Sequence, residues 1–351
     1  MKYVEKCYGK IYISNMAIKK NLSIETLRGI AILLVVIGHV IGSAPTGGMK
    51  IDFPHPLRYL YLWIDFIQMP LFTAIAGWAY ALKPYSKSAQ FGIFCKNKAL
   101  RLLVPMATVS TLYFLIQYII PGTNQKGDLS QLWRIYIFPY TIYWYLPSLF
   151  IIFLIQWWID KWEWMNSWKQ WWICLFVSVF LSLIIDRGVM HLLPNIFSFK
   201  GAFNQLPYFF VGVAVQRLAN ASSFFMKQRY LGIILLLCCV CLMYFVWIGS
   251  PEDIVLLRLC YPILIIPILF QLFSIKWHSS FFIWIGGYAY SIYLFHGFGT
   301  SGGRILLKVL GMKMIYLIFT LTTIISTMCP ILLDRVVCFS KLGRRYLLGK
   351  W

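Results

Sequence analysis

The chain has 351 residues, of which 60% are hydrophobic and only 12% are charged, and its mean hydropathy is +0.72. Soluble domains are about half apolar and about a quarter charged, so this composition excludes an ordinary soluble enzyme, a disordered protein and a secreted disulfide scaffold. The 32 Lys and Arg residues outnumber 11 Asp and Glu residues, which gives a net charge of +21. In a membrane protein such an excess belongs to loops that face anionic lipid. We therefore expect a partner in membrane lipid and none in nucleic acid.

Ten apolar segments follow one another along the chain, and each is expected to be a helix because lipid cannot satisfy open backbone groups. Their predicted limits are 27–45, 59–82, 99–121, 141–160, 169–187, 202–219, 229–249, 252–274, 280–300 and 313–338. The predicted fold class is thus an all-α integral membrane bundle. Three parts are expected: an N-terminal cytoplasmic segment 1–26, a transmembrane domain 27–338 and a basic cytoplasmic tail 339–351.

The loops predict the orientation, because roughly two thirds of the Lys and Arg residues fall on the side of the N-terminus, which is therefore placed in the cytoplasm. An even number of spans puts the C-terminus on the same side. The sequence shows no internal repeat and no loop long enough for a separate catalytic domain. Any chemistry is expected inside the bundle or at its faces.

The first apolar segment carries the sharpest pair of polar residues, Arg28 and His39. Eleven residues of α-helix bring both side chains to within about 20° of one face and separate them by about 16 Å along the axis. This layout suits an elongated anionic donor such as coenzyme A, with its phosphates on the guanidinium and its thioester at the imidazole. The alternatives are that Arg28 reaches the lipid headgroups and that His39 is a structural hydrogen-bonding residue.

Two further groups are expected near these ends. Lys98 and Arg101 share a helix face three residues apart, on the predicted cytoplasmic side with Arg28, and either bind the donor anion or only follow the positive-inside rule. Asp65, in the second segment, is predicted at a depth close to that of His39 and would orient it. The other readings of Asp65 are a cap at the outer interface and an ion pair with Arg58.

The ninth segment places His296 in the outer half of the membrane, where it would bind acceptor hydroxyls, support His39, or only make structural hydrogen bonds. Ser291 and Tyr293 are candidate donors to a developing oxyanion by position alone. The cysteines and histidines lack metal-ligand spacing, so no metal is expected.

Six motifs give the chain a resemblance to a known family, the acyltransferase 3 family of bacterial membrane proteins. They occur in the family order across nearly the whole chain. The matching stretches are Glu25–Leu33 with Gly38 and His39, Met69–Phe72 with Gly77, Lys98–Pro105, Tyr143–Leu146, Tyr208–Gly212 and Tyr290–His296.

The resemblance implies what several of these residues do. Members transfer acetyl, or sometimes succinyl, groups to sugars of surface polysaccharides and lipopolysaccharides. The family's Arg-x10-His pair maps onto Arg28 and His39, and its basic pair maps onto Lys98 and Arg101, with lysine in place of the more frequent arginine. In fucose-acetylase-like members a histidine stands where this chain has Gln68, which is taken as a candidate acceptor-binding residue.

These observations predict a membrane O-acyltransferase in the bacterial inner membrane, with acetyl-CoA or another short acyl-CoA as its donor and no permanently bound cofactor. The acceptor is expected to be a polysaccharide or a lipid-linked glycan. His39 acts as general base or as an acylated nucleophile, and the sequence leaves both open. The competing hypotheses are a polysaccharide-lipid flippase or transporter without acyl transfer, and a membrane acyltransferase that uses lipid donors.

Overall fold

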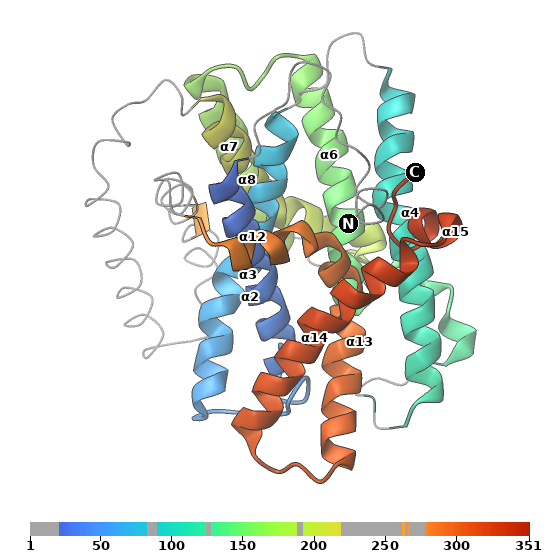
Figure 1. Ribbon diagram of the computed structural model, residues 1–351. Coiled ribbons are helices and arrows are strands. Elements are labelled where there is room, and N and C mark those ends of the chain that lie inside the picture. The colour runs from blue at the N-terminus through green and yellow to red at the C-terminus, as the bar shows by residue number, and fades with distance from the viewer. Residues whose placement is uncertain are drawn as a thin grey trace. The chain divides into compact units, whose positions relative to one another are not determined.

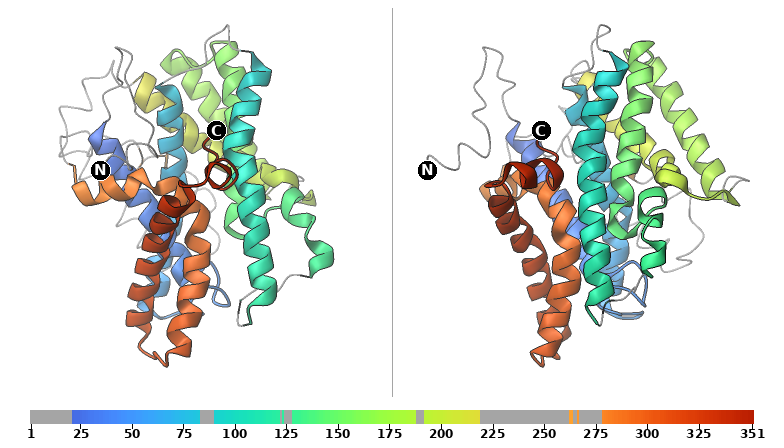
Figure 2. Two further views of the ribbon diagram at one scale, coloured as in Figure 1. Left: turned by 45° about the vertical axis from the view of Figure 1, so that its right-hand side comes forward. Right: turned by 90° about the vertical axis from the view of Figure 1, so that its right-hand side faces the viewer.

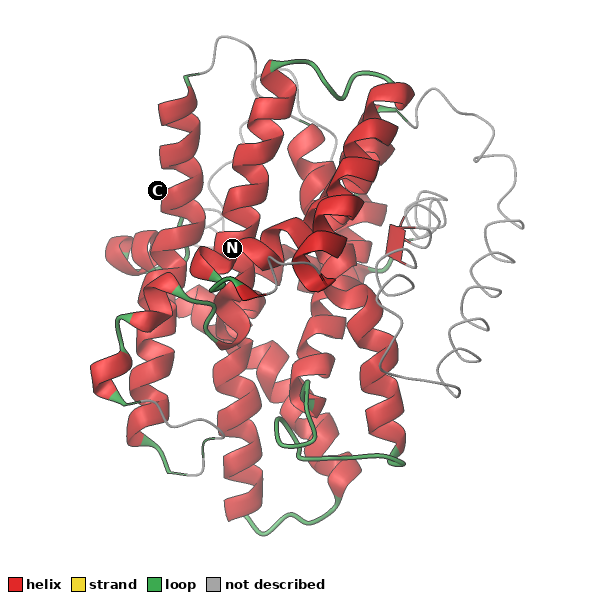
Figure 3. Ribbon diagram, turned by 180° about the vertical axis from the view of Figure 1, so that it is seen from behind, coloured by secondary structure: helices red, strands yellow, loops and turns green. Residues whose placement is uncertain are grey.

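The computed structural model describes most of the chain, and every described segment is a helix or a connection between helices (Figure 3). The described residues are 21–82, 90–121, 123, 128–187, 192–218, 262–263, 266 and 278–351. They fall into two compact units. The first unit comprises Met1–Asp52, Leu100–Leu132 and His278–Trp351, and the second comprises Phe53–Ala99 and Trp133–Trp277.

Six helical stretches among these residues are long and apolar enough to cross a membrane, which agrees with an all-helical membrane protein. They are Leu22–Ile41, Pro56–Ala81, Phe91–Ile119, Leu129–Lys161, Trp168–Ile185 and Ile315–Val337. The predicted segment 229–249 lies outside the described residues, and so does 252–274 apart from 262–263 and 266. The predicted count of ten spans and the cytoplasmic placement of both termini therefore stay predictions.

The first unit is built around α2 (Leu22–Ile41), which packs against α12 (Ser280–Gly287), α13 (Ala289–Val309) and α14 (Ile315–Val337). α13 and α14 lie side by side as an antiparallel pair, drawn in orange and red (Figures 1 and 2). The short α15 (Lys341–Tyr346) follows, and residues from Leu100 of α4 (Phe91–Ile119) also count with this unit.

The start of α2 is set by a cap rather than by its apolar run. The side chain of Asn21 accepts hydrogen bonds from the amides of Ser23 and Ile24 at 3.1 and 3.2 Å, and an acidic residue, Glu25, occupies the first turn. Both features stabilise a helix N-terminus. The helix accordingly begins at Leu22, five residues before the predicted limit.

Two glycines let α2 and α12 approach closely. A Cβ at Gly29 would overlap the backbone carbonyl of Phe282, and a Cβ at Gly286 would overlap that of Glu25. Small residues at such crossings are typical of helix packing in membranes. The contact places α12 beside the end of α2 that carries Arg28.

The predicted segment 280–300 is two helices instead of one. α12 ends at Gly287, and α13 begins at Ala289 and continues to Val309. The intervening Tyr288 has φ −103° and ψ 7°, which departs from helical geometry. The consecutive glycines before it weaken the helix at this point, and the packing of Gly286 on α2 fixes the direction of α12.

The second unit consists of helices packed on α8 (Phe199–Arg217). Its neighbours are α3 (Pro56–Ala81), α6 (Tyr145–Lys161) and α7 (Trp168–Arg187). The shorter elements are α5 (Arg134–Ile137), η2 (Thr141–Trp144) and η4 (Ile196–Ser198), while η1 (Leu129–Gln131) counts with the first unit. A buried hydrogen bond from Trp171 to the carbonyl of Phe210, at 2.9 Å, ties α7 to α8.

Candidate active site

Two histidine rings from α2 and α13 meet inside the first unit. The ring centroids of His39 and His296 are 5.0 Å apart with an interplanar angle of 87°, an edge-to-face arrangement. His296 has no exposed surface, whereas His39 is partly exposed. The structure thus brings together two of the three residues that the sequence predicted to be catalytic.

Backbone carbonyls fix the tautomer of both rings. Nδ1 of His39 lies 2.8 Å from the carbonyl oxygen of Val35. Nδ1 of His296 lies 3.0 and 2.8 Å from those of Ile292 and Tyr293. Because a carbonyl oxygen only accepts, each Nδ1 carries the proton and donates it, so in each neutral ring the lone pair is on Nε2. An imidazole held in this way presents a base on its outer nitrogen.

The Nε2 atom of His296 is buried and has no hydrogen-bond partner among the described residues. An unsatisfied buried acceptor is costly, and such groups concentrate where a substrate or water completes the hydrogen bond. The ring of Tyr293 lies 6.0 Å from that of His296 between centroids, at 49°, so this tyrosine also lies in the histidine neighbourhood.

At the other end of α2, Arg28 has an anion and a cation in its surroundings. Nη1 of Arg28 is 3.7 Å from Oε1 of Glu25, and Arg101 is close enough to repel the guanidinium of Arg28 electrostatically. Arg28 therefore has one carboxylate and a second cation in its surroundings. Because α2 is one uninterrupted helix, helical rise separates Arg28 from His39 by about 16 Å along its axis.

Ser291 is turned to a different partner. Its hydroxyl donates to the carboxylate of Asp334 on α14, and both residues are buried. Lys350 approaches the same carboxylate, with Nζ 3.4 Å from Oδ2. The Ser291 hydroxyl, a candidate oxyanion donor by its position, is thus bound to a buried carboxylate that also pairs with the partly exposed Lys350.

Asp65 and Gln68 belong to the second unit. Oδ1 of Asp65 accepts from the hydroxyl of Tyr61 at 2.9 Å and from Nε2 of Gln68 at 3.3 Å, all on α3. Gln68 is buried, and its Oε1 has no partner among the described residues. Since His39 lies in the other unit and each unit is described by itself, the predicted pairing of Asp65 with His39 stays a prediction.

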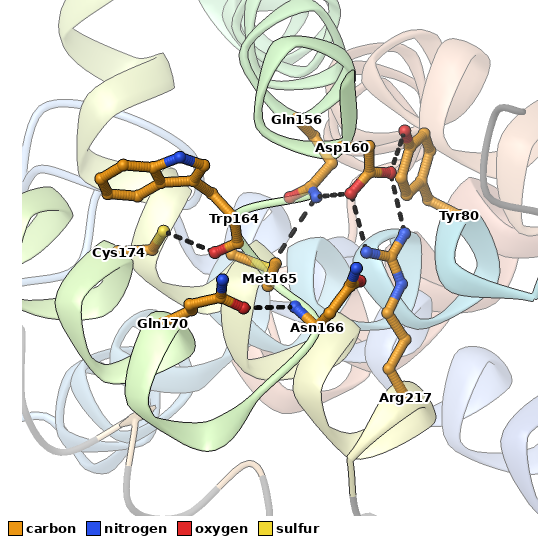
Figure 4. Close-up of polar contacts among 9 residues, drawn as sticks. All are labelled: Tyr80, Gln156, Asp160, Trp164, Met165, Asn166, Gln170, Cys174 and Arg217. Atoms are coloured by element: carbon orange, nitrogen blue, oxygen red, sulfur yellow. Dashed lines mark hydrogen bonds and ion pairs between the residues drawn. The ribbon is translucent and has the colours of Figure 1, made fainter. Parts of the chain in front are cut away.

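A second charged cluster in this unit is internally neutralised (Figure 4). The guanidinium of Arg217 binds both carboxylate oxygens of Asp160, at 2.7 and 2.8 Å. The same carboxylate accepts from the hydroxyl of Tyr80 at 2.7 Å and from Nε2 of Gln156 at 2.8 Å. The arrangement joins α3, α6 and α8.

Lys98 lies beside this second cluster. Its Nζ is 3.5 Å from the ring centroid of Phe153, 5.4 Å from that of Phe94 and 5.9 Å from that of Tyr80. These are cation–π distances. The structure shows the ammonium group of Lys98 against aromatic rings of the second unit. Since Arg101 belongs to the first unit, the predicted anion site of Lys98 with Arg101 stays a prediction.

Sequence reasoning missed Asp334, Lys350 and the contacts of Tyr290, described below. Asp334 is an acidic residue in the last turns of a predicted span, and such residues are expensive in lipid, so a signal was present. The partnership with Lys350 depends on how the chain returns after α14, which no spacing reveals. Among the residues that the structure describes, no group of three or more His, Cys, Asp or Glu side chains is arranged to hold a metal.

A family model described as "Acyltransferase domain" matches residues 21–335. No curated protein and no solved structure matches the chain. The matched range includes α2, α13 and most of α14. It therefore covers Arg28 and Arg101 as well as His39 and His296.

Proposed function

The chain belongs to the acyltransferase 3 family, as its motifs predicted, and from this premise we propose that it transfers an acetyl or similar short acyl group from cytosolic acyl-CoA to a sugar hydroxyl. The family and the apolar helices make it a membrane acyltransferase. The donor, the glycan acceptor of a surface or exported polysaccharide, and the bacterial inner membrane as its location are our proposals.

The observation that carries the proposal is a pair of clusters in the first unit, each with one member on α2. Arg28 with Arg101 supplies surplus positive charge at one end of α2, and His39 with His296 supplies imidazoles further along. Guanidinium groups bind phosphate oxygens with charge-assisted hydrogen bonds. Coenzyme A joins its phosphates to its thioester by a long, slim, uncharged arm, which suits clusters separated along a helix.

In the reaction we propose, Nε2 of His39 takes the proton of the acceptor hydroxyl as the hydroxyl oxygen attacks the thioester carbonyl. The tetrahedral intermediate then collapses, the carbon–sulfur bond breaks, and the proton passes to the departing thiolate. Atoms balance with an ester and free coenzyme A as products. Attack by Nε2 itself, giving an acyl-histidine, uses the same tautomer.

In this scheme Nε2 of His296 accepts a hydrogen bond from the acceptor sugar. Tyr293, whose ring lies next to that of His296, is on the acceptor side of the site. Gln68 belongs to the second unit, and its contact with the acceptor stays a prediction. Ser291 is left out because its hydroxyl is bound to Asp334. Lys98 is left out of the donor site because its ammonium group lies over Phe153.

The test is acyl transfer in membranes that contain the full chain. Membranes are incubated with labelled acetyl-CoA and a polysaccharide fraction, comparing wild type, His39→Ala and Arg28→Ala. We expect His39→Ala to lower kcat by about a thousandfold and Arg28→Ala mainly to raise the KM for acetyl-CoA. The exposed His278 and Lys313, replaced by alanine, serve as matched controls that leave both constants unchanged.

The opposite results are equally clear. Label transfer unchanged in both site variants contradicts the mechanism. Absence of transfer with every acyl-CoA, together with movement of glycan-lipid across the membrane, favours a transporter. Transfer from a phospholipid but not from acyl-CoA favours the lipid-donor alternative.

A further inference from the structure

The helix that carries Arg101 has a defect one turn further on. Pro105 lies inside α4 and has no amide hydrogen. In an α-helix the amide of residue 105 would bond the carbonyl oxygen of residue 101. The carbonyl of Arg101 therefore has no helical donor.

A tyrosine of α13 donates to this carbonyl. The hydroxyl of Tyr290 lies 2.5 Å from the carbonyl oxygen of Arg101. Tyr290 is the second residue of α13, six residues before His296, which is about 9 Å along the helix. The same helix that holds His296 thus replaces the hydrogen bond that Pro105 removes from α4.

The segment after α14 contacts α4 on both sides of Pro105. Nε1 of Trp351 donates to the carbonyl of Leu100 at 2.9 Å, and the hydroxyl of Thr108 donates to the carbonyl of Tyr346 at 2.6 Å. Gly349 has φ +59°, and a Cβ there would lie 2.6 Å from the carbonyl oxygen of Arg101. α15 and α4 lie beside each other accordingly (Figure 2).

These contacts oppose an electrostatic force. Arg101 and Arg28 repel each other in the absence of an anion, and a proline-interrupted helix bends more easily than a regular one. Without an attachment, the turn that carries Arg101 would swing away from Arg28 and separate the two guanidinium groups. A ligand would then have to bring them together, at a cost to its affinity.

We propose that Tyr290 is a positioning residue of the donor site: its hydroxyl, by replacing the helical hydrogen bond lost at Pro105, holds Arg101 beside Arg28 for the phosphates of acyl-CoA. The proposal rests on the function proposed above. It assigns to the tyrosine of the Tyr290–His296 motif a role in donor affinity, separate from the proton transfer at the histidines.

The test is a double-mutant cycle of Tyr290→Phe and Pro105→Ala in the full chain, with purified protein in detergent. Two quantities are measured: the KM and kcat of acyl transfer, and the Kd for labelled acetyl-CoA. Tyr290→Phe is expected to raise KM and Kd about tenfold, the size of one lost hydrogen bond that leaves a polar group unpaired, with kcat within about twofold.

In Pro105→Ala the new amide restores the helical bond to the carbonyl of Arg101, so the hydroxyl becomes redundant. Adding Tyr290→Phe to this background is expected to change KM and Kd by less than about twofold. A tyrosine that only stabilised the fold would lower thermal stability equally in both backgrounds and would shift kcat and KM together. The exposed Tyr316 on α14, replaced by Phe, is the matched control.

Arg101→Ala separates this inference from the function on which it rests. If Arg101→Ala raises KM and Tyr290→Phe does not, the positioning role is wrong and the donor site stands. An equal effect of Tyr290→Phe in both backgrounds likewise overturns the positioning role. If Arg101→Ala leaves KM and Kd unchanged, or wild type neither binds nor transfers the acyl group, the proposed donor site fails and the inference fails with it.

Discussion

The two units each contain a buried or half-buried arginine, yet the surroundings of these arginines differ. In the second unit Arg217 is matched by Asp160 in a two-point ion pair, and Tyr80 and Gln156 complete the carboxylate's hydrogen bonds. In the first unit Arg28 reaches Glu25 only at 3.7 Å and has a second cation, Arg101, nearby. In the first arrangement the charges are balanced without a ligand, although Nε of Arg217 and Oε1 of Gln156 have no hydrogen-bond partner among the described residues. The second arrangement has positive charge to spare for an anion.

The comparison distinguishes a structural charge cluster, in which positive and negative charges are equal, from a ligand site, in which positive charge is in excess. A closed pair of charges is expected to affect folding when it is broken, because the remaining charge is left buried. Removing one cation from a site with excess positive charge is expected to weaken ligand binding. The free energy of unfolding is expected to stay the same or to rise. Each prediction below tests one side of this distinction.

The largest expected effect is on the closed pair. Asp160→Ala leaves Arg217 without its carboxylate and is expected to lower the free energy of unfolding by about 3–5 kcal/mol. Thermal unfolding in detergent measures the loss. Replacing both residues, as Asp160→Leu with Arg217→Met, is expected to recover most of the stability because no buried charge remains. A double variant as unstable as Asp160→Ala would contradict an explanation based on the unpaired charge.

The matching change in the cluster with excess positive charge is Arg28→Ala. We expect the KM for acetyl-CoA to rise about thirtyfold through loss of charge-assisted hydrogen bonds to phosphate, while the thermal midpoint stays the same or rises because the repulsion with Arg101 is relieved. Arg28→Lys keeps the charge but loses the two-point geometry, so its KM is expected between the two. A fall in stability with unchanged KM would place Arg28 with the structural pairs.

Ionic strength gives a smaller effect that needs no mutation. Salt screens exposed charges over about 10 Å at 0.1 M and buried pairs much less. Raising salt from about 0.05 to 0.3 M is therefore expected to raise the KM for acetyl-CoA about threefold while the thermal midpoint changes little. In Arg101→Ala the salt dependence of KM is expected to be weaker. An equal salt dependence in both proteins would remove Arg101 from the donor site.

How far the sequence anticipates this structure depends on the range of the interaction concerned. Local periodicity places Arg28 and His39 on one helix, and the predicted depth of His296 is consistent with its contact to His39. The family motifs also predict the match over residues 21–335. The break at Tyr288 was missed, because it depends on the packing of Gly286 against α2 as well as on local propensity.

The contacts that sequence reasoning could not supply join segments far apart in the chain. Ser291 reads as a free hydroxyl until α14 brings Asp334 to it. Pro105 does predict that the carbonyl four residues earlier lacks a helical donor, but only the structure shows that the hydroxyl of Tyr290 supplies one. Lys98 looks equivalent to its neighbour Arg101 on the helix, although the aromatic rings near its ammonium group come partly from other helices.

Lys98 supplies the last and smallest test, because it lies three residues from Arg101 on the same helix and yet has different partners. Its ammonium group is 3.5 Å from the ring centroid of Phe153, so Lys98→Met is expected to cost about 1 kcal/mol of stability through the lost cation–π contact. The KM for acetyl-CoA is expected to change by less than about twofold, against about tenfold for Arg101→Ala. If Lys98→Met raises KM as much as Arg101→Ala does, the donor site includes both cations. The distinction between the donor site and the balanced cluster of Asp160 and Arg217 would then be wrong for Lys98.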